Sequence, residues 1–197
     1  GAALFDSMDV GQNVGLTLKE NDRLSDKETA KIVAEKLEMV GLPGTEKMKP
    51  SDLSGGMKKR VSLARAISTN PKYILYDEPT TGLDPVMSDQ IDDLIKELSS
   101  KLNITSIVVT HDIFSVYDVA DHVAMMHDGK TYFFGTPTEL VETKDPIIRE
   151  FLARTDKEAH EALERIEEEE EKEKKEKPNG KTNGKSEDTK VTDTSKP

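Results

Sequence analysis

The chain has 197 residues, with 28 Lys and Arg against 39 Asp and Glu, a net charge of −11, and neither Cys nor Trp. This length suits one domain, with or without a tail, and the acidic balance argues against broad nucleic-acid binding, so we expect no nucleic-acid partner. The lack of Cys excludes disulfides, thiolate metal sites and a Cys nucleophile within these residues. No apolar run approaches the roughly 20 residues of a membrane span, and residues 1–6 lack a basic leader, so we expect a soluble, cytosolic protein.

The composition changes near residue 157. Residues 157–197 contain 10 Lys and Arg, 13 Asp and Glu and only five apolar residues. Such a segment cannot bury enough apolar surface to offset its chain entropy, so we expect a charged, mostly disordered acidic tail. A solvated helix is expected to continue from residue 149 to about residue 175. Residues 1–156 have a net charge of −8 and must hold the core.

The first 70 residues are expected to be mainly helical. Asp26 is predicted to cap a helix over residues 27–39, whose apolar side chains recur at helical spacing. The glycines and proline of Gly41–Gly44 end it. A further helix is predicted over Met57–Ser68, with Ser54 as its cap.

The pattern changes after residue 70. Tyr73–Tyr76 is a continuous apolar run, predicted to be a strand buried on both faces, and residues 104–110 form a second buried strand. Between them, Pro85–Leu102 is an amphipathic helix. Strand, helix and strand in this order predict a βαβ unit with a parallel sheet. A hairpin at Asp128-Gly129 and a short helix beginning at Pro137 complete the predicted body.

Polar side chains follow both strands of this unit. Asp77 and Glu78 end the first strand, and His111 and Asp112 follow the second. The carboxyl ends of parallel strands meet at one edge of a sheet, where ligands bind, so we expect these groups to converge. The alternative is that Asp77 caps a turn and His111 makes an ordinary hydrogen bond.

A Ser-Gly-Gly string precedes the helix of residues 57–68. Ser54 can cap that helix, and Gly55 and Gly56 leave backbone N–H groups open at its positive end, which suits an anion or a phosphate. The string alone is also typical of a flexible loop.

The order of four motifs is more specific. Leu53–Gly56, Tyr73–Thr80, Gly82–Pro85 and Val109–Asp112 follow one another as in ABC-type ATPases. From signature motif through Walker B and D-loop to switch histidine, residues 1–152 resemble their nucleotide-binding domain. The resemblance implies an α/β fold of the P-loop NTPase kind, with a parallel sheet and an α-helical subdomain. It divides the chain into a helical subdomain, half of a RecA-like catalytic core and the charged tail: residues 1–70, 71–156 and 157–197.

The resemblance also implies ATP and Mg²⁺ as cofactors and assigns roles to individual residues. Asp77 resembles the Walker B carboxylate that holds Mg²⁺ through water, and Glu78 the residue that polarises the attacking water. His111 resembles the switch that contacts the γ-phosphate, and Asp84 lies in the D-loop, which crosses the dimer interface. The signature residues, which clasp the nucleotide of the opposite subunit, are Leu53, Ser54, Gly55 and Gly56, with Met57 where many relatives have Gln.

One family element has no counterpart in these residues. The phosphate loop, Gly-x-x-x-x-Gly-Lys-Ser/Thr, has three apparent endings, at residues 129–131, 180–182 and 184–186. Each lacks the leading glycine, because Ala124, Lys175 and Asn179 stand there. Gln12 does not follow a buried strand and is no Q-loop glutamine. We therefore expect a domain incomplete at its N-terminus, without Walker A and Q-loop, and inactive in ATP hydrolysis by itself.

Within this family, the sequences of residues 3–14, 53–61, 77–95 and 105–112 are most similar to the ATPase subunit of Mla/MCE-type phospholipid transporters. This resemblance implies lipid transport between membranes by a homodimer of ATP-binding subunits. It implies an integral-membrane permease docked near Leu4–Leu18, an MCE-type lipid-binding protein, and a peripheral position on the cytoplasmic face of the inner membrane. Two alternatives stay open: the ATPase of another ABC importer, and a non-hydrolysing regulatory or interaction fragment.

Overall fold

The computed structural model describes residues 4–19 and 24–155, and the predicted tail lies outside them. The described residues belong to one compact unit. In the described ranges, no helix is both long enough and apolar enough to cross a membrane. The elements, in chain order, are α1 (Val10–Lys19), α2 (Asp26–Met39), a 3-10 turn (Pro50–Asp52), α3 (Gly55–Ile67), β1 (Tyr73–Asp77), α4 (Pro85–Leu102), β2 (Thr105–Val109), α5 (Ile113–Val119), β3 (Val123–His127), β4 (Lys130–Gly135), α6 (Pro137–Glu142) and α7 (Pro146–Thr155).

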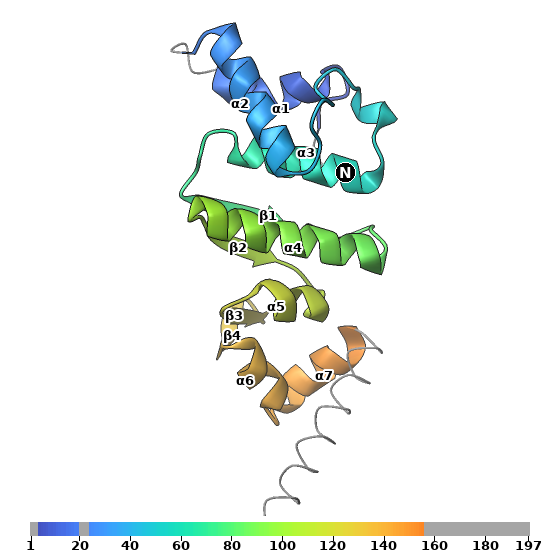
Figure 1. Ribbon diagram of the computed structural model, residues 1–197. Helices are drawn as coiled ribbons and strands as arrows, with labels where there is room; N and C mark the ends of the chain where they lie inside the picture. The colour runs from blue at the N-terminus through green and yellow to red at the C-terminus, as the bar shows by residue number, and fades with distance from the viewer. Residues whose placement is uncertain (1–3, 20–23, 156–197) are drawn as a thin grey trace, which may run out of the picture. The chain divides into compact units, whose positions relative to one another are not determined.

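The helices α1, α2 and α3 pack together on the β1 side of the sheet (Figure 1). Asn13 on α1 is fully buried, and its side chain both accepts from the Phe5 N–H at 2.8 Å and donates to the Phe5 carbonyl at 3.1 Å. The N-terminal segment is thereby fastened to α1. The apolar residues enclosed by these helices are Val10, Val14, Leu18, Val33, Leu37, Val61, Leu63 and Ala64.

The start of α2 differs from the sequence prediction by one residue. Ser25 is the N-cap, and Asp26 is the first residue of the helix. The Ser25 hydroxyl accepts from the Glu28 N–H at 3.3 Å, and the Glu28 carboxylate accepts from the Ser25 N–H at 2.8 Å. This reciprocal capping box satisfies two N–H groups that a cap at Asp26 would leave open.

The βαβ unit is confirmed. β1 and β2 pair in parallel from Tyr73↔Thr105 to Asp77↔Val109, and α4 connects them over the predicted range. Asp84 caps α4, and Asn103 ends it with a φ of 52°. The helix and the sheet share one core, formed by Ile74, Tyr76, Ile91, Leu94, Ile95, Leu98 and Ile104.

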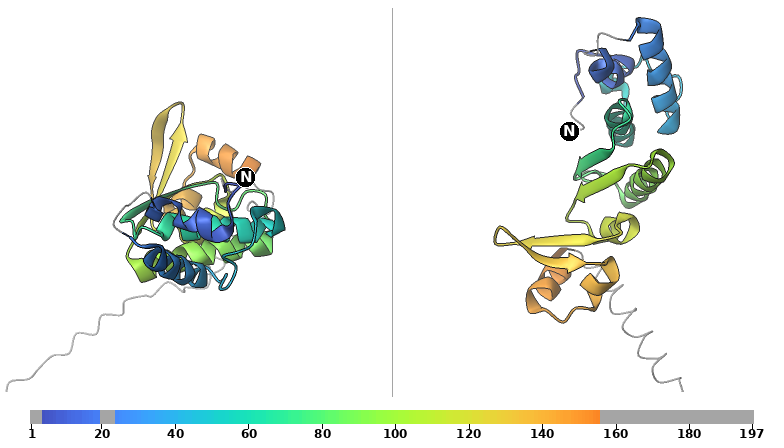
Figure 2. Two further views of the ribbon diagram at one scale, coloured as in Figure 1. Left: turned by 90° about the horizontal axis from the view of Figure 1, so that it is seen from above. Right: turned by 90° about the vertical axis from the view of Figure 1, so that its left-hand side faces the viewer.

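The prediction that Tyr73–Tyr76 is buried on both faces is wrong, and so is the prediction that the second strand is buried. Side chains alternate along β1, so that Ile74 and Tyr76 face the core while Leu75 is 75% exposed. Ile107 and Val109 on β2 are 54% and 57% exposed. The reason is that α4 covers one face of the sheet, and none of the elements drawn in colour lies on the other (Figure 2).

The C-terminal part of the unit follows the predicted turns. β3 and β4 form an antiparallel hairpin whose turn has positive φ at Asp128 (48°) and Gly129 (71°). Two such residues fit a type I′ turn, which matches the twist of the strands. Thr136 caps α6, with Pro137 as the first helical residue, as predicted.

Candidate functional site

Glu78 and His111 meet at the carboxyl end of the parallel sheet, as the sequence predicted. The Glu78 N–H donates to the Val109 carbonyl at 2.9 Å, which extends the ladder one residue beyond β1. Glu78 Oε1 lies 2.8 Å from His111 Nδ1. Two groups 33 residues apart in the chain are therefore held in direct contact by strand pairing.

The backbone of Glu78 adopts an uncommon conformation. Its φ is 48°, in the left-handed region, which costs a residue with a Cβ about 1 kcal/mol or more. Lys59 on α3 donates from Nζ to the Glu78 carbonyl at 3.0 Å, and the Thr81 hydroxyl donates to Glu78 Oε2 at 2.9 Å. His111 at Oε1 and Thr81 at Oε2 hold the carboxylate in one orientation, and Lys59 holds the backbone.

The two side chains shift each other's protonation. Burial pushes the pKa of Glu78 upward, but the hydrogen bonds from His111 and Thr81 outweigh it, and the net pKa lies below the ordinary value. The hydrogen bond to Glu78, and then its charge, raise the pKa of His111. Both effects favour a carboxylate facing an imidazolium, a charge-assisted hydrogen bond.

Asp77 occupies the last position of β1, on the exposed face of the strand that also carries Tyr73 and Leu75. Together with Lys59 and Pro79 it lines a hollow between α3 and the sheet. Its carboxylate is the hard oxygen donor that Mg²⁺ prefers, and Mg²⁺ commonly takes one or two carboxylates along with phosphate oxygens. No group of three acidic or His side chains suited to a metal ion exists in the described part of the chain.

The predicted signature residues lie at the start of α3. Leu53 is buried in the core, and Ser54 caps the helix, its hydroxyl accepting from the Met57 N–H at 3.2 Å. Gly56 faces α4 so closely that an added Cβ would stand 2.1 Å from the Met87 methyl. Gly55 is less crowded, because an added Cβ there would stand 3.6 Å from Leu83 Cδ2. Helix α3 begins two residues earlier than predicted, because capping by Ser54 makes Gly55 its first residue.

Asp84 caps α4 in the same way, accepting from the Met87 N–H at 3.0 Å. The starts of α3 and α4 therefore lie against each other through Gly56 and Met87. The predicted site residues thus fall into two groups: Asp77, Glu78 and His111 at the carboxyl end of the sheet, and the signature residues beside Asp84.

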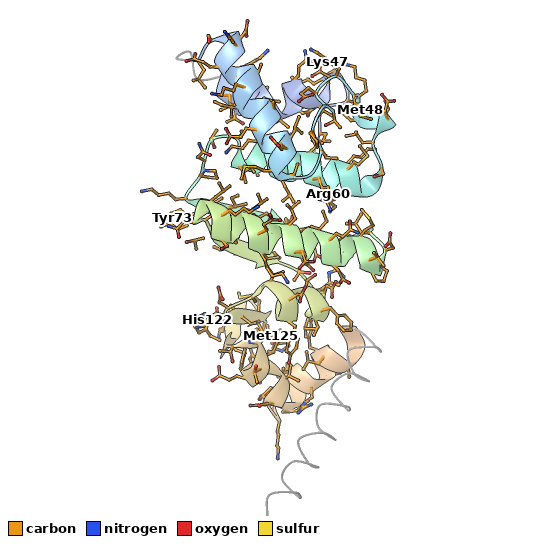
Figure 3. The ribbon with its side chains drawn as sticks, in the orientation of Figure 1. Lys47, Met48, Arg60, Tyr73, His122 and Met125 are labelled. Atoms are coloured by element: carbon orange, nitrogen blue, oxygen red, sulfur yellow. The ribbon has the colours of Figure 1, made fainter. Side chains whose placement is uncertain are left out.

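Three residues near the site were not singled out from the sequence. Lys59 and Thr81 bind Glu78, and Arg60 donates to the Val40 carbonyl at 3.0 Å and to Gln90 at 3.2 Å, lying between α3 and α4 (Figure 3). The spacing of Thr81, three residues after Glu78, is a local turn signal. Lys59 and Arg60 carry no such signal, because a cation on a helix most often points to solvent.

The comparison with protein families gives a match of residues 2–81 to the family described as ABC transporter. Among curated proteins, the chain is 42% identical over 150 residues to the intermembrane phospholipid transport system ATP-binding protein MlaF of Haemophilus influenzae, covering 76% of this chain and 57% of that protein. The corresponding MlaF of Escherichia coli K12 is 43% identical, with 76% and 56% covered. A probable ribonucleotide transport ATP-binding protein, mkl, of Mycobacterium leprae is 39% identical, with 76% and 43% covered. The chain thus spans about half the length of these relatives.

Solved structures agree. The ATP-binding cassette MJ0796, in a dimeric post-hydrolysis state with ADP and Pi, matches with a TM-score of 0.61 and 33% identity, over 69% of this chain and 60% of that one. CbiO1 of Clostridium perfringens, part of the ABC transporter complex CbiONQ, matches with a TM-score of 0.65 and 34% identity, over 80% of this chain and 62% of that one. Both share the arrangement of sheet and helices described above.

Proposed function

Because the chain carries an ABC-type ATP-binding domain of the Mla-like kind, we propose that it serves as the ATP-binding subunit of a transporter that moves phospholipids between membranes. The identity to two MlaF proteins over three quarters of the chain supports this assignment. The observation that carries the chemistry is the Glu78–His111 pair at the carboxyl end of the parallel sheet.

In this proposal Glu78 orients and polarises the attacking water. Its carboxylate is kept ionised by the bonds from His111 and Thr81, and the bond from Lys59 fixes its backbone. A group whose orientation is fixed before the reaction needs little reorganisation in the transition state. His111, whose pKa is raised by Glu78, holds a proton at Nδ1 toward Glu78 and presents its other ring nitrogen to the γ-phosphate.

When bound, ATP would supply the transferred phosphoryl group and Mg²⁺ would neutralise part of its charge. Asp77 is the residue assigned to the metal, through water. The exposed position of its carboxylate, next in the chain to Glu78, supports that role.

A second ATP-binding subunit completes the site. Leu53, Ser54, Gly55 and Gly56 present the N-terminus of α3 to the nucleotide of the opposite subunit, and Asp84 lies at the interface. The direct packing of Gly56 on Met87 supports this, since it joins the signature helix to the helix that Asp84 caps. The dimeric state of the similar cassette MJ0796 agrees with it.

The remaining partners follow from the transport assignment. They are an integral-membrane permease, docked on the segment near Leu4–Leu18, and an MCE-type lipid-binding protein. The subunit then sits peripherally on the cytoplasmic face of the inner membrane. Support comes from the words "intermembrane phospholipid transport system" in the names of the MlaF relatives.

A second candidate function differs from the first only in the transported substrate. The mycobacterial relative, named for ribonucleotide transport, is 39% identical, close to the 42% and 43% of the MlaF proteins. A nucleotide-transporting system with the same ATP chemistry is therefore the runner-up.

The 197 residues alone are proposed not to hydrolyse ATP, since they contain no Gly-x-x-x-x-Gly-Lys-Ser/Thr to hold the phosphates. The purified chain with Mg-ATP should show no turnover above a Glu78→Gln control. Turnover that Glu78→Gln abolishes would overturn this part.

The decisive experiment replaces the 150 matching residues of the Escherichia coli MlaF with those of this chain and measures ATP hydrolysis and phospholipid transfer in the reconstituted system. We expect both to be retained, and Glu78→Gln in the chimera to lower hydrolysis by about 100-fold or more. Thr69→Ser, a surface change outside the site, is the matched control. ATP hydrolysis without lipid transfer would contradict the proposal that phospholipid is the transported substrate. A chimera that assembles but does not hydrolyse ATP would contradict the ATPase assignment.

A further inference from the structure

Asp92 on α4 is a buried acid that the proposed chemistry does not use. Its side chain belongs to a residue only 3% exposed, on the helix face that also carries buried Ser88 and Ile95. Its Oδ1 has no hydrogen-bond partner in the described structure. A buried carboxylate oxygen without a partner is costly, so its presence asks for a reason.

The other oxygen of Asp92 ends a short chain of hydrogen bonds. The Ser115 hydroxyl on α5 donates to Asp92 Oδ2 at 2.6 Å. The same hydroxyl lies 3.3 Å from Asp112 Oδ2 and 3.4 Å from the Thr80 hydroxyl. Ser115 therefore stands between three groups but has a single hydrogen to donate.

Two of these groups belong to the loops that carry the Glu78–His111 pair. Thr80 lies two residues after Glu78 and is 5% exposed. Asp112 follows His111 directly and caps α5, its Oδ1 accepting from the Phe114 N–H at 2.9 Å and the Ser115 N–H at 3.4 Å. The Ser115 hydroxyl thus contacts both loops, so a change in its hydrogen bonding alters the contacts of each.

The charged groups that face Asp92 are all acidic. Asp112 and Asp118 approach from α5 and Asp89 from α4 itself, while Lys96 is engaged by Asp93 and Asp118. Burial, together with the repulsion from these three carboxylates, raises the pKa of Asp92 to about 6, although the hydrogen bond from Ser115 opposes the rise.

We propose that Asp92 is a positioning residue for His111, acting through Ser115 on the Asp112 cap. This inference rests on the proposed function only in that it takes Glu78 and His111 as the catalytic pair. When Asp92 is ionised, the Ser115 hydrogen points to Asp92 Oδ2, and Asp112 Oδ2 lacks it. When a solvent proton adds to Asp92 Oδ2, that O–H donates to Ser115 Oγ, and the Ser115 hydrogen turns to Asp112 Oδ2. The charge of Asp92 thereby sets how firmly the residue next to His111 is held.

The test is a pH titration of the full 197-residue chain by NMR, without nucleotide. The probes are the carboxyl carbon of Asp92, the Phe114 amide and the His111 ring. We expect the Phe114 amide and the His111 ring each to show an inflection at the midpoint of Asp92, in addition to that of His111 itself. Absence of any inflection at the Asp92 midpoint in the unmodified chain would overturn the proposal, and this measurement requires no variant.

Variants separate Asp92 from the neighbouring His111 titration. In Asp92→Asn, the amide donates to Ser115 as the protonated carboxyl does, so the Phe114 amide should stay at its low-pH position and lose that inflection. In Ser115→Ala, Asp92 should still titrate, but Phe114 and His111 should no longer follow it. Asp93→Asn, the same change at a side chain 71% exposed on the same helix, should leave the inflections in place.

An inflection that persists in Asp92→Asn would refute the coupling. Because no nucleotide is present, these outcomes are independent of the ATPase measurements on the chimera. A chimera that fails to hydrolyse ATP, together with a chain that shows the coupled titration, would reject the proposed function and keep this inference.

Discussion

Two regions of the described structure each bury one charged side chain: Lys36 in the helical region α1–α3 and Asp92 in the βαβ region β1–α4–β2. The two side chains differ in their hydrogen-bond partners. Lys36 Nζ donates to Glu35 at 3.1 Å and to Asn70 at 2.9 Å. Asp92 has one donor and one oxygen without any. A fully partnered buried charge is part of the packing, whereas a half-partnered one beside the sheet edge is a group whose charge can change.

The two regions also differ in how they cover apolar side chains. The apolar residues of α1, α2 and α3 are enclosed among three helices, while the sheet leaves Leu75, Ile107 and Val109 exposed on its outer face. That outer face has the composition of a strand face made for burial. The helical region is therefore the more self-contained of the two.

The largest expected effect tests this difference in cover. Leu37→Ala in α2 and Ile95→Ala in α4, both fully buried, should each lower the free energy of unfolding by about 2–5 kcal/mol. Leu75→Ala, on the outer face of β1, should change it by no more than about 0.5 kcal/mol. Urea unfolding followed by circular dichroism measures all three. A loss at Leu75 as large as that at Ile95 would show that the outer face is covered in solution.

The next effect concerns the charge of Asp92. The folded pKa of about 6 exceeds the unfolded value near 3.8, so the folded chain binds the proton more tightly. The resulting stability is present below pH 3.8 and is lost as pH rises through 6, by about 2–3 kcal/mol. The free energy of unfolding of Asp92→Asn should therefore rise relative to that of the unmodified chain between pH 4 and pH 7. Urea midpoints at several pH values measure this difference. A difference between the two chains that does not vary with pH would contradict the raised pKa.

Lys36 should behave in the opposite sense. Lys36→Met keeps the side-chain length but removes the bonds to Glu35 and Asn70, so stability should fall by about 1 kcal/mol. The exposed Lys31→Met on the same helix is the control and should be nearly neutral. Equal or greater stability of Lys36→Met, measured by thermal unfolding, would place Lys36 with Asp92 as a cost to the fold.

The smallest effect is at the Glu78–His111 pair, where His111 is 67% exposed and solvent screens the charges. Glu78→Gln should lower the pKa of His111, because its hydrogen bond and charge raise it. The His111 contribution to stability is present below pH 6.5 and is lost as pH rises through its raised pKa; that of Glu78 is lost as pH falls through its lowered pKa. Ring NMR of His111 reads the shift, and an unchanged midpoint in Glu78→Gln would rule out the pair in solution.

Local features of the fold were predictable from the sequence. The bounds of α4, the turn at Asp128-Gly129 and the cap at Ser54 depend on neighbours within a few residues, and all three predictions are confirmed. The one-residue error at Ser25 arose because two adjacent residues can both cap a helix, and only the Glu28 bond distinguishes them. For Asp92, its spacing of four residues from Ser88 and three from Ile95 on one helix face was the available signal.

The sequence by itself determined the order of the motifs, the parallel pairing of two strands and hence the meeting of Glu78 with His111. Only the tertiary structure decided which face of β1 is exposed, that Lys59 binds the Glu78 carbonyl across 19 residues, and that Asp92 is buried against Ser115 across 23. The physical reason is one of range. Caps, turns and periodicity are set by adjacent residues, whereas burial and cross-element hydrogen bonds depend on how helices pack over the sheet.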